Sequence, residues 1–234
     1  MSTKDIIDAV RKDNRVNLTE IESKLLLSKA GIPVTETKLA TSKEEATKIA
    51  NNLGYPVVLK ISSSEILHKS DIGGVKLGLE TETSVLEAYE EIISNARIHE
   101  PNAKIDGISV QSNVKTGVEI IIGSSKDAQF GPFVMFGLGG VFVEVLKDVA
   151  FRIVPLDPRD AKEMIREIKG YPLLEGYRGG APCDISAIEE SIIKLSNFLN
   201  ENEDIKELDL NPIFVYEKGL IAVDARVILE NSIN

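Results

Sequence analysis

The segment from Tyr55 to Val75 constrains the fold of this chain more than any other. It opens with an apolar strand pattern, Tyr55-Pro56-Val57-Val58-Leu59-Lys60-Ile61, then passes through a polar loop and the Gly73-Gly74 pair into a second strand pattern. A short apolar run bounded by Gly and Pro is typical of a buried strand. Strand lysine, polar loop and glycine pair together predict a grip for nucleotide phosphates. His68 in that loop suggests a phosphoryl acceptor, although a surface or packing histidine fits the local pattern about equally well.

Three helix starts share one capping pattern. Thr19, Ser42 and Ser84 each precede a glutamate by three residues. This spacing lets the hydroxyl and the carboxylate satisfy the first backbone N–H groups of a helix. The helix after Thr19 is expected to end at Gly31, and the strands around His68 lie between the second and third helices. The first hundred residues are therefore expected to form a small α+β unit.

The pattern becomes richer in strands after Ile105. Two helices, at about 160–168 and 186–200, follow these strands, and a hairpin of Leu208–Tyr216 with Leu220–Val227 closes the chain. Two α+β subdomains joined near residue 105 are expected, one of residues 19–105 and the other of residues 1–18 with 106–234. The strand-like segments before the helices are Ile108–Gln111, Glu119–Ile122, Phe133–Phe136, Val141–Val145 and Phe151–Val154.

The closing hairpin carries a candidate metal site. Glu207, Asp209 and Asn211 alternate along its first strand, so they project from one face. Asp224 stands among apolar residues in the second strand, and pairing across the hairpin can bring it beside Asp209 and Asn211. Two carboxylates and an amide oxygen are hard ligands that suit Mg²⁺. A polar strand face turned to solvent would also carry such residues.

Composition excludes several classes of protein. The chain has 234 residues, a formal net charge of −10, and 43% hydrophobic residues. The acidic balance, without a basic block, argues against a nucleic-acid or anionic-membrane surface. No apolar run reaches the ~18–20 residues of a membrane span, and the start of the chain lacks an apolar signal core. The single Cys183 excludes an internal disulfide. A cytoplasmic protein is expected.

The ordered motifs resemble those of an ATP-grasp domain. More narrowly, the chain resembles the nucleotide-binding β subunits of the ADP-forming acetyl-CoA synthetases over about residues 15–230. The resemblance implies an ATP-grasp fold of the α+β class, with the nucleotide bound between two α+β subdomains. The motifs that carry it are Val57–Lys60, Gly73–Lys76, Gly117–Gly123, Leu208–Ile213 and Val223–Ala225, with His68–Val75 and Gly131–Glu144 as the more specific part.

The resemblance also implies roles for individual residues. His68 would be a phosphorylated relay histidine. Lys60 and Lys69 would contact nucleotide phosphates, since a lysine is a compact cation. The remaining implied roles are the adenine hinge at Gln111, Ser112 and Val114, an acidic residue near the ribose or the lysine network at Glu119, and the magnesium ligands Asp209, Asn211 and Asp224.

The family implies a phosphoryl relay between two subunits. A separate CoA-binding α subunit forms an acyl phosphate, and its own histidine passes the phosphoryl group towards ADP on the β subunit. ATP/ADP and Mg²⁺ are the implied ligands, acetate the first substrate to consider, and α2β2 the implied assembly. The chain departs from the related succinyl-CoA synthetases, because His68-Lys69-Ser70 replaces their Gly-Arg-Gly type of loop.

Two other functions remain open at this point. A free-standing ATP-grasp carboxylate ligase would need an additional substrate-binding region, which the sequence lacks. A nucleotide-sensing module would bind ATP without chemistry. Neither needs a histidine at position 68, so phosphorylation of His68 would distinguish both from the relay subunit.

Overall fold

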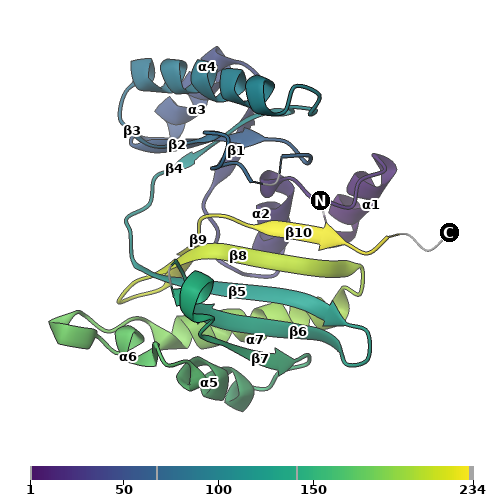
Figure 1. The fold of residues 1–234 in the computed structure, drawn as a ribbon, viewed down its shortest axis with the longest axis vertical. Coiled ribbons are helices and arrows are strands. Elements are labelled where there is room, and N and C mark those ends of the chain that lie inside the picture. The colour runs from purple at the N-terminus through teal and green to yellow at the C-terminus, as the bar shows by residue number, and fades with distance from the viewer. Residues whose placement is uncertain (1, 67, 141, 232–234) are drawn as a thin grey trace. The chain divides into compact units, whose positions relative to one another are not determined.

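The structure is a computed structural model that describes residues 2–66, 68–140 and 142–231. The chain divides into two compact units, each described here by itself (Figure 1). Unit 1 comprises residues 1–18, 22–34 and 116–234, and unit 2 comprises residues 19–21 and 35–115. No helix in the described part of the chain is long and apolar enough to cross a bilayer.

This division differs from the expected boundaries in two places. Residues 22–34 belong to unit 1, because Leu26 and Leu27 pack into its hydrophobic core. Residues 106–115 belong to unit 2, because strand β4 (Gly107–Ser112) pairs with two other strands of that unit. The change of texture near residue 105 marks a helix-to-strand transition inside unit 2 and not a boundary.

Unit 2 is one antiparallel sheet with two helices on one face (Figure 1). The sheet order is β1-β4-β2-β3, so β2 lies between two partners, and all six of its residues are buried. The Ser42 hydroxyl accepts from the Glu45 N–H, as its capping pattern predicts. The elements are β1 (Thr37–Ala40), α3 (Lys43–Leu53), β2 (Val57–Ser62), β3 (Val75–Leu79), α4 (Glu82–His99) and β4.

Helix α4 begins earlier than expected. The prediction made Ser84 the residue before the helix, but Thr81 occupies that position. The Thr81 hydroxyl accepts from the Ser84 N–H while the Ser84 hydroxyl accepts from the Thr81 N–H. Ser84 is therefore the inner partner of the capping pair, which shifts the start by three residues.

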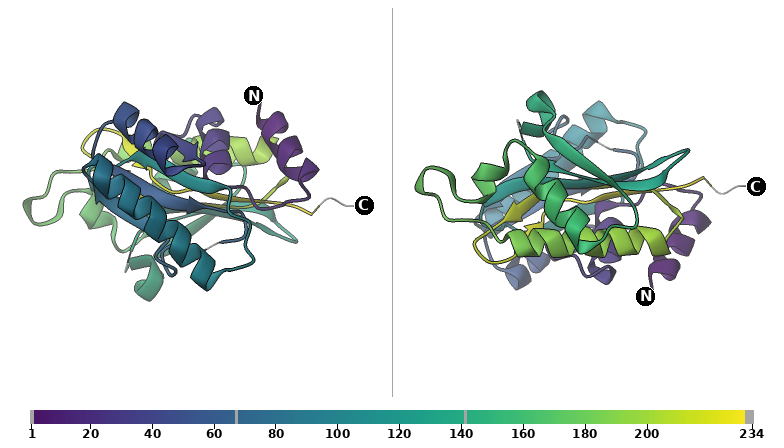
Figure 2. Two further views of the ribbon diagram at one scale, coloured as in Figure 1. Left: turned by 90° about the horizontal axis from the view of Figure 1, so that it is seen from above. Right: turned by 90° about the horizontal axis from the view of Figure 1, so that it is seen from below.

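Unit 1 is a six-stranded antiparallel sheet whose main path runs β10-β8-β5-β6-β7, with β9 paired to β8. Helices α5 and α7 lie together against β6 and β7 (Figure 2). The elements are α1 (Thr3–Lys12), α2 (Glu20–Lys29, of which 20 and 21 fall in unit 2), β5 (Val118–Asp127), β6 (Gly131–Leu138), β7 (Val149–Ile153), α5 (Pro158–Glu167), α6 (Tyr171–Leu174), η2 (Tyr177–Gly179), α7 (Ile185–Glu201), β8 (Ile205–Val215), β9 (Leu220–Ala222) and β10 (Arg226–Leu229).

Helix α1 was not expected. Its capping box pairs Ser2 with Asp5, and a search for a glutamate at the third position overlooks an aspartate there. Ile6, Ile7 and Val10 bury one side of this helix in the core of unit 1. The helix therefore has both a start signal and a packing face.

One expected strand of unit 1 is wrong. The predicted strand Val141–Val145 is instead part of the π-helix η1 (Phe142–Leu146), apart from Val141, which lies outside the described residues. The pairing of Gly137 with Val149 makes this segment the connection between β6 and β7. Val145 and Leu146 are 69% and 63% exposed. Their apolar side chains give the sequence the composition of a strand, but they are not buried as those of a core strand would be.

Candidate functional site

Lys60 is a buried cation at the centre of the unit 2 sheet. It lies on β2, directly across from Val75 on β3 and Ser109 on β4, and only 5% of it is exposed. Its ammonium group donates to Glu20 Oε1 at 2.8 Å. Burying an ammonium group costs several kcal/mol unless a partner compensates. The Glu20 carboxylate supplies that compensation.

Lys69 joins the same carboxylate from the loop between β2 and β3. Its Nζ donates to Glu20 Oε2 at 2.6 Å, so the two oxygens of one glutamate each accept from a different lysine. The loop from 63 to 74 thereby brings the two predicted phosphate ligands, Lys60 and Lys69, to one point. Sequence reasoning treated Glu20 only as part of a helix start. The available signal was the position of Glu20, which is the first residue of its helix and lies two residues before a second glutamate, Glu22.

His68 is exposed, while Ile66 and Lys69 near it are held in place. Ile66 is 4% exposed, and the Lys69 carbonyl accepts from the Gly74 N–H at 2.8 Å. A Cβ on Gly74 would lie 2.8 Å from that carbonyl oxygen, so glycine is required there. No hydrogen bond fixes the imidazole among the described residues, and Asp71 is not a partner. The loop therefore presents the imidazole to solvent.

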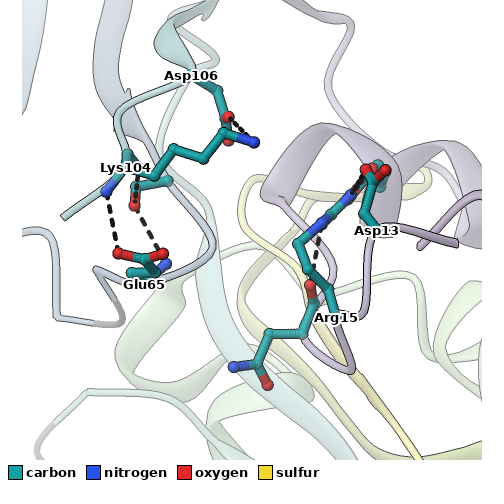
Figure 3. A network of polar contacts seen from close by, with 8 residues as sticks. Asp13, Arg15, Glu65, Lys104 and Asp106 are labelled. Atoms are coloured by element: carbon teal, nitrogen blue, oxygen red, sulfur yellow. Dashed lines mark hydrogen bonds and ion pairs between the residues drawn. The ribbon is translucent and has the colours of Figure 1, made fainter. Parts of the chain in front are cut away.

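The first half of this loop is tied to the segment before β4 (Figure 3). The Lys104 N–H donates to Glu65 Oε2 at 2.9 Å, and the Ser63 hydroxyl donates to the Lys104 carbonyl at 2.7 Å. The Lys104 ammonium lies 3.9 Å from Asp106. Both ends of the loop around His68 are thus anchored within unit 2.

The predicted adenine hinge is the end of β4. Gln111 is 3% exposed, and its carboxamide oxygen accepts from the Thr35 and Thr37 hydroxyls, each at 3.4 Å. Ser112 is the last residue of β4, and Val114 lies in the irregular segment that follows. The Gln111 side chain is thus engaged inside unit 2, and the backbone beyond Ser112 leaves the sheet.

Glu119 lies in unit 1 beside a glycine turn. It is exposed on β5, and its carbonyl accepts from the Gly139 N–H at 2.8 Å. A Cβ on Gly139 would lie 3.0 Å from Glu119 Cβ, and one on Gly140 would lie 3.5 Å from Glu119 Oε2. The two glycines therefore leave room for the glutamate side chain along this turn.

The predicted magnesium ligands lie on the β8 hairpin of unit 1. Asp209 is half-buried and lies directly across from Gly123 on β5 and from Arg226 on β10. Asn211 is exposed on the same strand. Burial raises the pKa of Asp209; the charge of Arg226 lowers it, and the negative charge of Asp224 raises it further. Asp224 is thus close enough to Asp209 to repel it.

The second strand of this hairpin is interrupted, which corrects the predicted continuous strand from Leu220 to Val227. Residues 223–225 separate β9 from β10, and the Val223 N–H donates to the Pro212 carbonyl at 3.1 Å. Asp224 lies in this interruption, where its carboxylate accepts from the Ala225 N–H at 2.8 Å. The described residues contain no group of three or more His, Cys, Asp or Glu suited to a metal, and the predicted ligands are two carboxylates and an amide.

Comparison with known proteins supplies the family. The model of the ATP-grasp domain matches residues 9–229. The β subunit of ADP-forming acetate–CoA ligase I from Pyrococcus furiosus is 49% identical over 226 residues, which are 97% of this chain and 97% of that protein.

Solved structures show the same likeness. Acetyl-coenzyme A synthetase 1 of Candidatus Korarchaeum cryptofilum, in complex with coenzyme A and Ca-AMPCP, matches with a TM-score of 0.96 at 51% identity, covering 98% of this chain and 100% of that chain. In another structure of that enzyme, with coenzyme A and Mg-AMPPCP, the phosphohistidine segment points towards the nucleotide-binding site; its TM-score is 0.87 at 48% identity, covering 98% and 100%. The predicted α+β ATP-grasp fold is confirmed, and the chain belongs to the ATP-grasp family of β subunits of ADP-forming acetate–CoA ligases.

Proposed function

We propose that this chain is the nucleotide-binding β subunit of an ADP-forming acyl-CoA synthetase, a ligase that interconverts acetyl-CoA, ADP and phosphate with acetate, CoA and ATP. The observation that carries the proposal is the exposed His68 beside Lys69, which shares the Glu20 carboxylate with the buried Lys60. The full-length likeness to named β subunits supports it.

The chemistry proposed for His68 is reversible phosphoryl transfer. An imidazole nitrogen attacks the γ-phosphorus of ATP, an N–P bond forms, the bond from phosphorus to the bridging oxygen breaks, and ADP leaves. In the synthetic direction an ADP oxygen takes the phosphoryl group from phosphorylated His68. Such transfer depends on positioning and on neutralising the phosphate oxygens. Lys60 and Lys69 are the cations proposed for that task.

The nucleotide's other groups are assigned by the same proposal. The backbone around Ser112 and Val114 is proposed to read the adenine edge, with the engaged Gln111 side chain holding that backbone in place. Glu119, in the space left by Gly139 and Gly140, is proposed to meet the ribose. Support comes from the backbone leaving the sheet after Ser112 and from the glycine turn.

Asp209, Asn211 and Asp224 would hold Mg²⁺. The donor set fits the ion, because Mg²⁺ prefers oxygen ligands and two mutually repelling carboxylates gain from a divalent cation between them. When bound, the ion supplies positive charge to the β- and γ-phosphate oxygens. The residues' own part is to hold the ligand oxygens, those of Asp209 and Asn211 on β8 and those of Asp224 in the segment between β9 and β10.

The partner is proposed to be a separate CoA-binding α subunit with its own phosphohistidine, in an α2β2 complex. The β-subunit name of the relatives supports the existence of a partner. Acetate as the acid, the stoichiometry and a cytoplasmic location stay predictions. Size measurement of the co-expressed complex and cell fractionation test the last two.

The decisive experiment uses the complex with the α subunit, Mg²⁺ and γ-labelled ATP. Wild type should acquire acid-labile, base-stable phosphate on His68, and His68→Ala should lose both that label and overall ATP formation. The matched control is His99→Ala, since His99 is exposed at the end of α4. Unchanged ATP formation by the His68 variant would refute the relay.

A further inference from the structure

We propose that Glu20 is a positioning residue of the phosphate site, which holds the ammonium groups of Lys60 and Lys69 at one point against their mutual repulsion. This inference rests on the proposed function, because it assumes that these lysines meet nucleotide phosphates. Glu20 itself is not proposed to touch the nucleotide.

The geometry is a carboxylate between two cations. Glu20 Oε1 accepts from Lys60 at 2.8 Å and Oε2 accepts from Lys69 at 2.6 Å. The Glu20 side chain is 3% exposed, against 6% for Lys60 and 16% for Lys69. The three side chains come from the start of α2, from β2 and from the loop after β2. The shared carboxylate thus joins these three segments of unit 2 through charge.

Repulsion between the lysines explains why the carboxylate is needed. Two ammonium groups bound to one carboxylate lie within a few ångströms of each other, and little water screens them at this degree of burial. The three side chains together carry one net positive charge. A neutral residue at position 20 would leave two like charges in the same buried space, and the lysines would move apart.

The same arrangement is compatible with phosphate binding. An ammonium group has three N–H donors, so one lysine can donate to Glu20 and to a phosphate oxygen at once. Holding two lysines in place beforehand lowers the entropy lost when a phosphate binds. As the first residue of α2, Glu20 also lies at the positive end of a helix dipole, which favours its negative charge.

The test compares ligands with and without phosphate. Glu20→Gln keeps the shape and one acceptor oxygen but removes the charge. Calorimetry on the complex with the α subunit should show ATP and ADP affinities that fall by about tenfold or more, the effect of losing one charge-assisted contact. Adenosine should bind as it does to wild type. Glu20→Asp, which keeps the charge, should recover part of the loss. Glu22→Gln is the matched control, because Glu22 pairs with Arg15 and not with a lysine of this cluster. Arg15 also pairs with Asp13 (Figure 3).

A double-mutant cycle tests whether Glu20 acts through the lysines. In a Lys69→Met background, Glu20→Gln should cost several-fold less ATP affinity than it does alone. Equal losses for ATP and adenosine, tighter ATP binding by Glu20→Gln, or additive losses would each overturn the inference. Wild type that fails to bind ATP would refute the proposed function instead, whereas wild type that binds ATP with the same affinity as Glu20→Gln refutes only the role of Glu20.

Discussion

The two charged clusters of this protein are built in opposite ways. In unit 2, the single Glu20 carboxylate accepts from two lysines, so each charge has a neighbour of the other sign. In unit 1, the negative charge of Asp224 raises the pKa of Asp209, and the charge of Arg226 lowers it. The first cluster joins charges of opposite sign, whereas the second places two like charges near each other. Removing one charge should therefore destabilise one unit and stabilise the other.

The largest effect is expected at Lys60. Lys60→Met should lower the free energy of unfolding by about 2 kcal/mol, because Glu20 loses one charge-assisted hydrogen bond and keeps the one from Lys69. It should also reduce phosphoryl transfer strongly. Urea unfolding measures the first change. Lys38→Met is the control, since Lys38 forms an exposed pair with Glu36 and should change stability by less than about 1 kcal/mol. A Lys60 variant as stable as this control would contradict the comparison.

A change of opposite sign is expected at Asp224. Asp224→Asn should raise the free energy of unfolding in the absence of Mg²⁺ by roughly 1 kcal/mol, because it removes the repulsion on Asp209. The same variant should bind Mg²⁺–ATP about tenfold more weakly, as calorimetry can show. Asp8→Asn, on an exposed position of α1, should change neither quantity. Destabilisation by Asp224→Asn without Mg²⁺ would mean that the pair is not repulsive.

The smallest effect concerns Asp184, the residue that caps the start of α7 in unit 1. It accepts from the Ala187 and Gly219 N–H groups, and these hydrogen bonds lower its pKa, that from Gly219 most. A lowered folded pKa gives stability that is present above the unfolded pKa of about 3.9 and is lost as pH falls through the folded pKa.

Asp184→Ala should therefore cost about 1 kcal/mol at pH 7, the usual value of a helix cap. Below about pH 4 the difference from wild type should shrink, because the protonated aspartate is a weaker acceptor. Unfolding curves at both pH values check this. A difference that does not depend on pH would assign the stabilisation to packing.

The sequence predicted those parts of the site that depend on local pattern. Lys60 on a buried strand and Asp209 and Asn211 on alternate positions of β8 follow from strand periodicity and the order of motifs. The nucleotide, magnesium and relay roles of the individual residues stay predictions. Glu20 was missed as a site residue, because its pairing with lysines 40 and 49 residues away depends on tertiary structure.

The errors in the predicted fold also arise where the structure depends on tertiary contacts. The π-helix at Phe142–Leu146 has the apolar composition of a strand, and only the pairing of β6 with β7 shows that it is a connection. The interruption at Val223–Ala225 depends on a hydrogen bond to Pro212, on the neighbouring strand. Residues 106–115 join unit 2 through strand pairs that no local pattern contains.

The exposure of His68 has a consequence for timing. An imidazole that faces solvent can be reached by a phosphoryl donor from outside the chain, which a buried one cannot. Water reaches it as well, and an N–P bond on histidine is prone to hydrolysis. Under the proposed relay, each phosphorylated His68 is thus a short-lived store of free energy. The yield of ATP per acyl-CoA then depends on how the rate of transfer to ADP compares with the rate of hydrolysis.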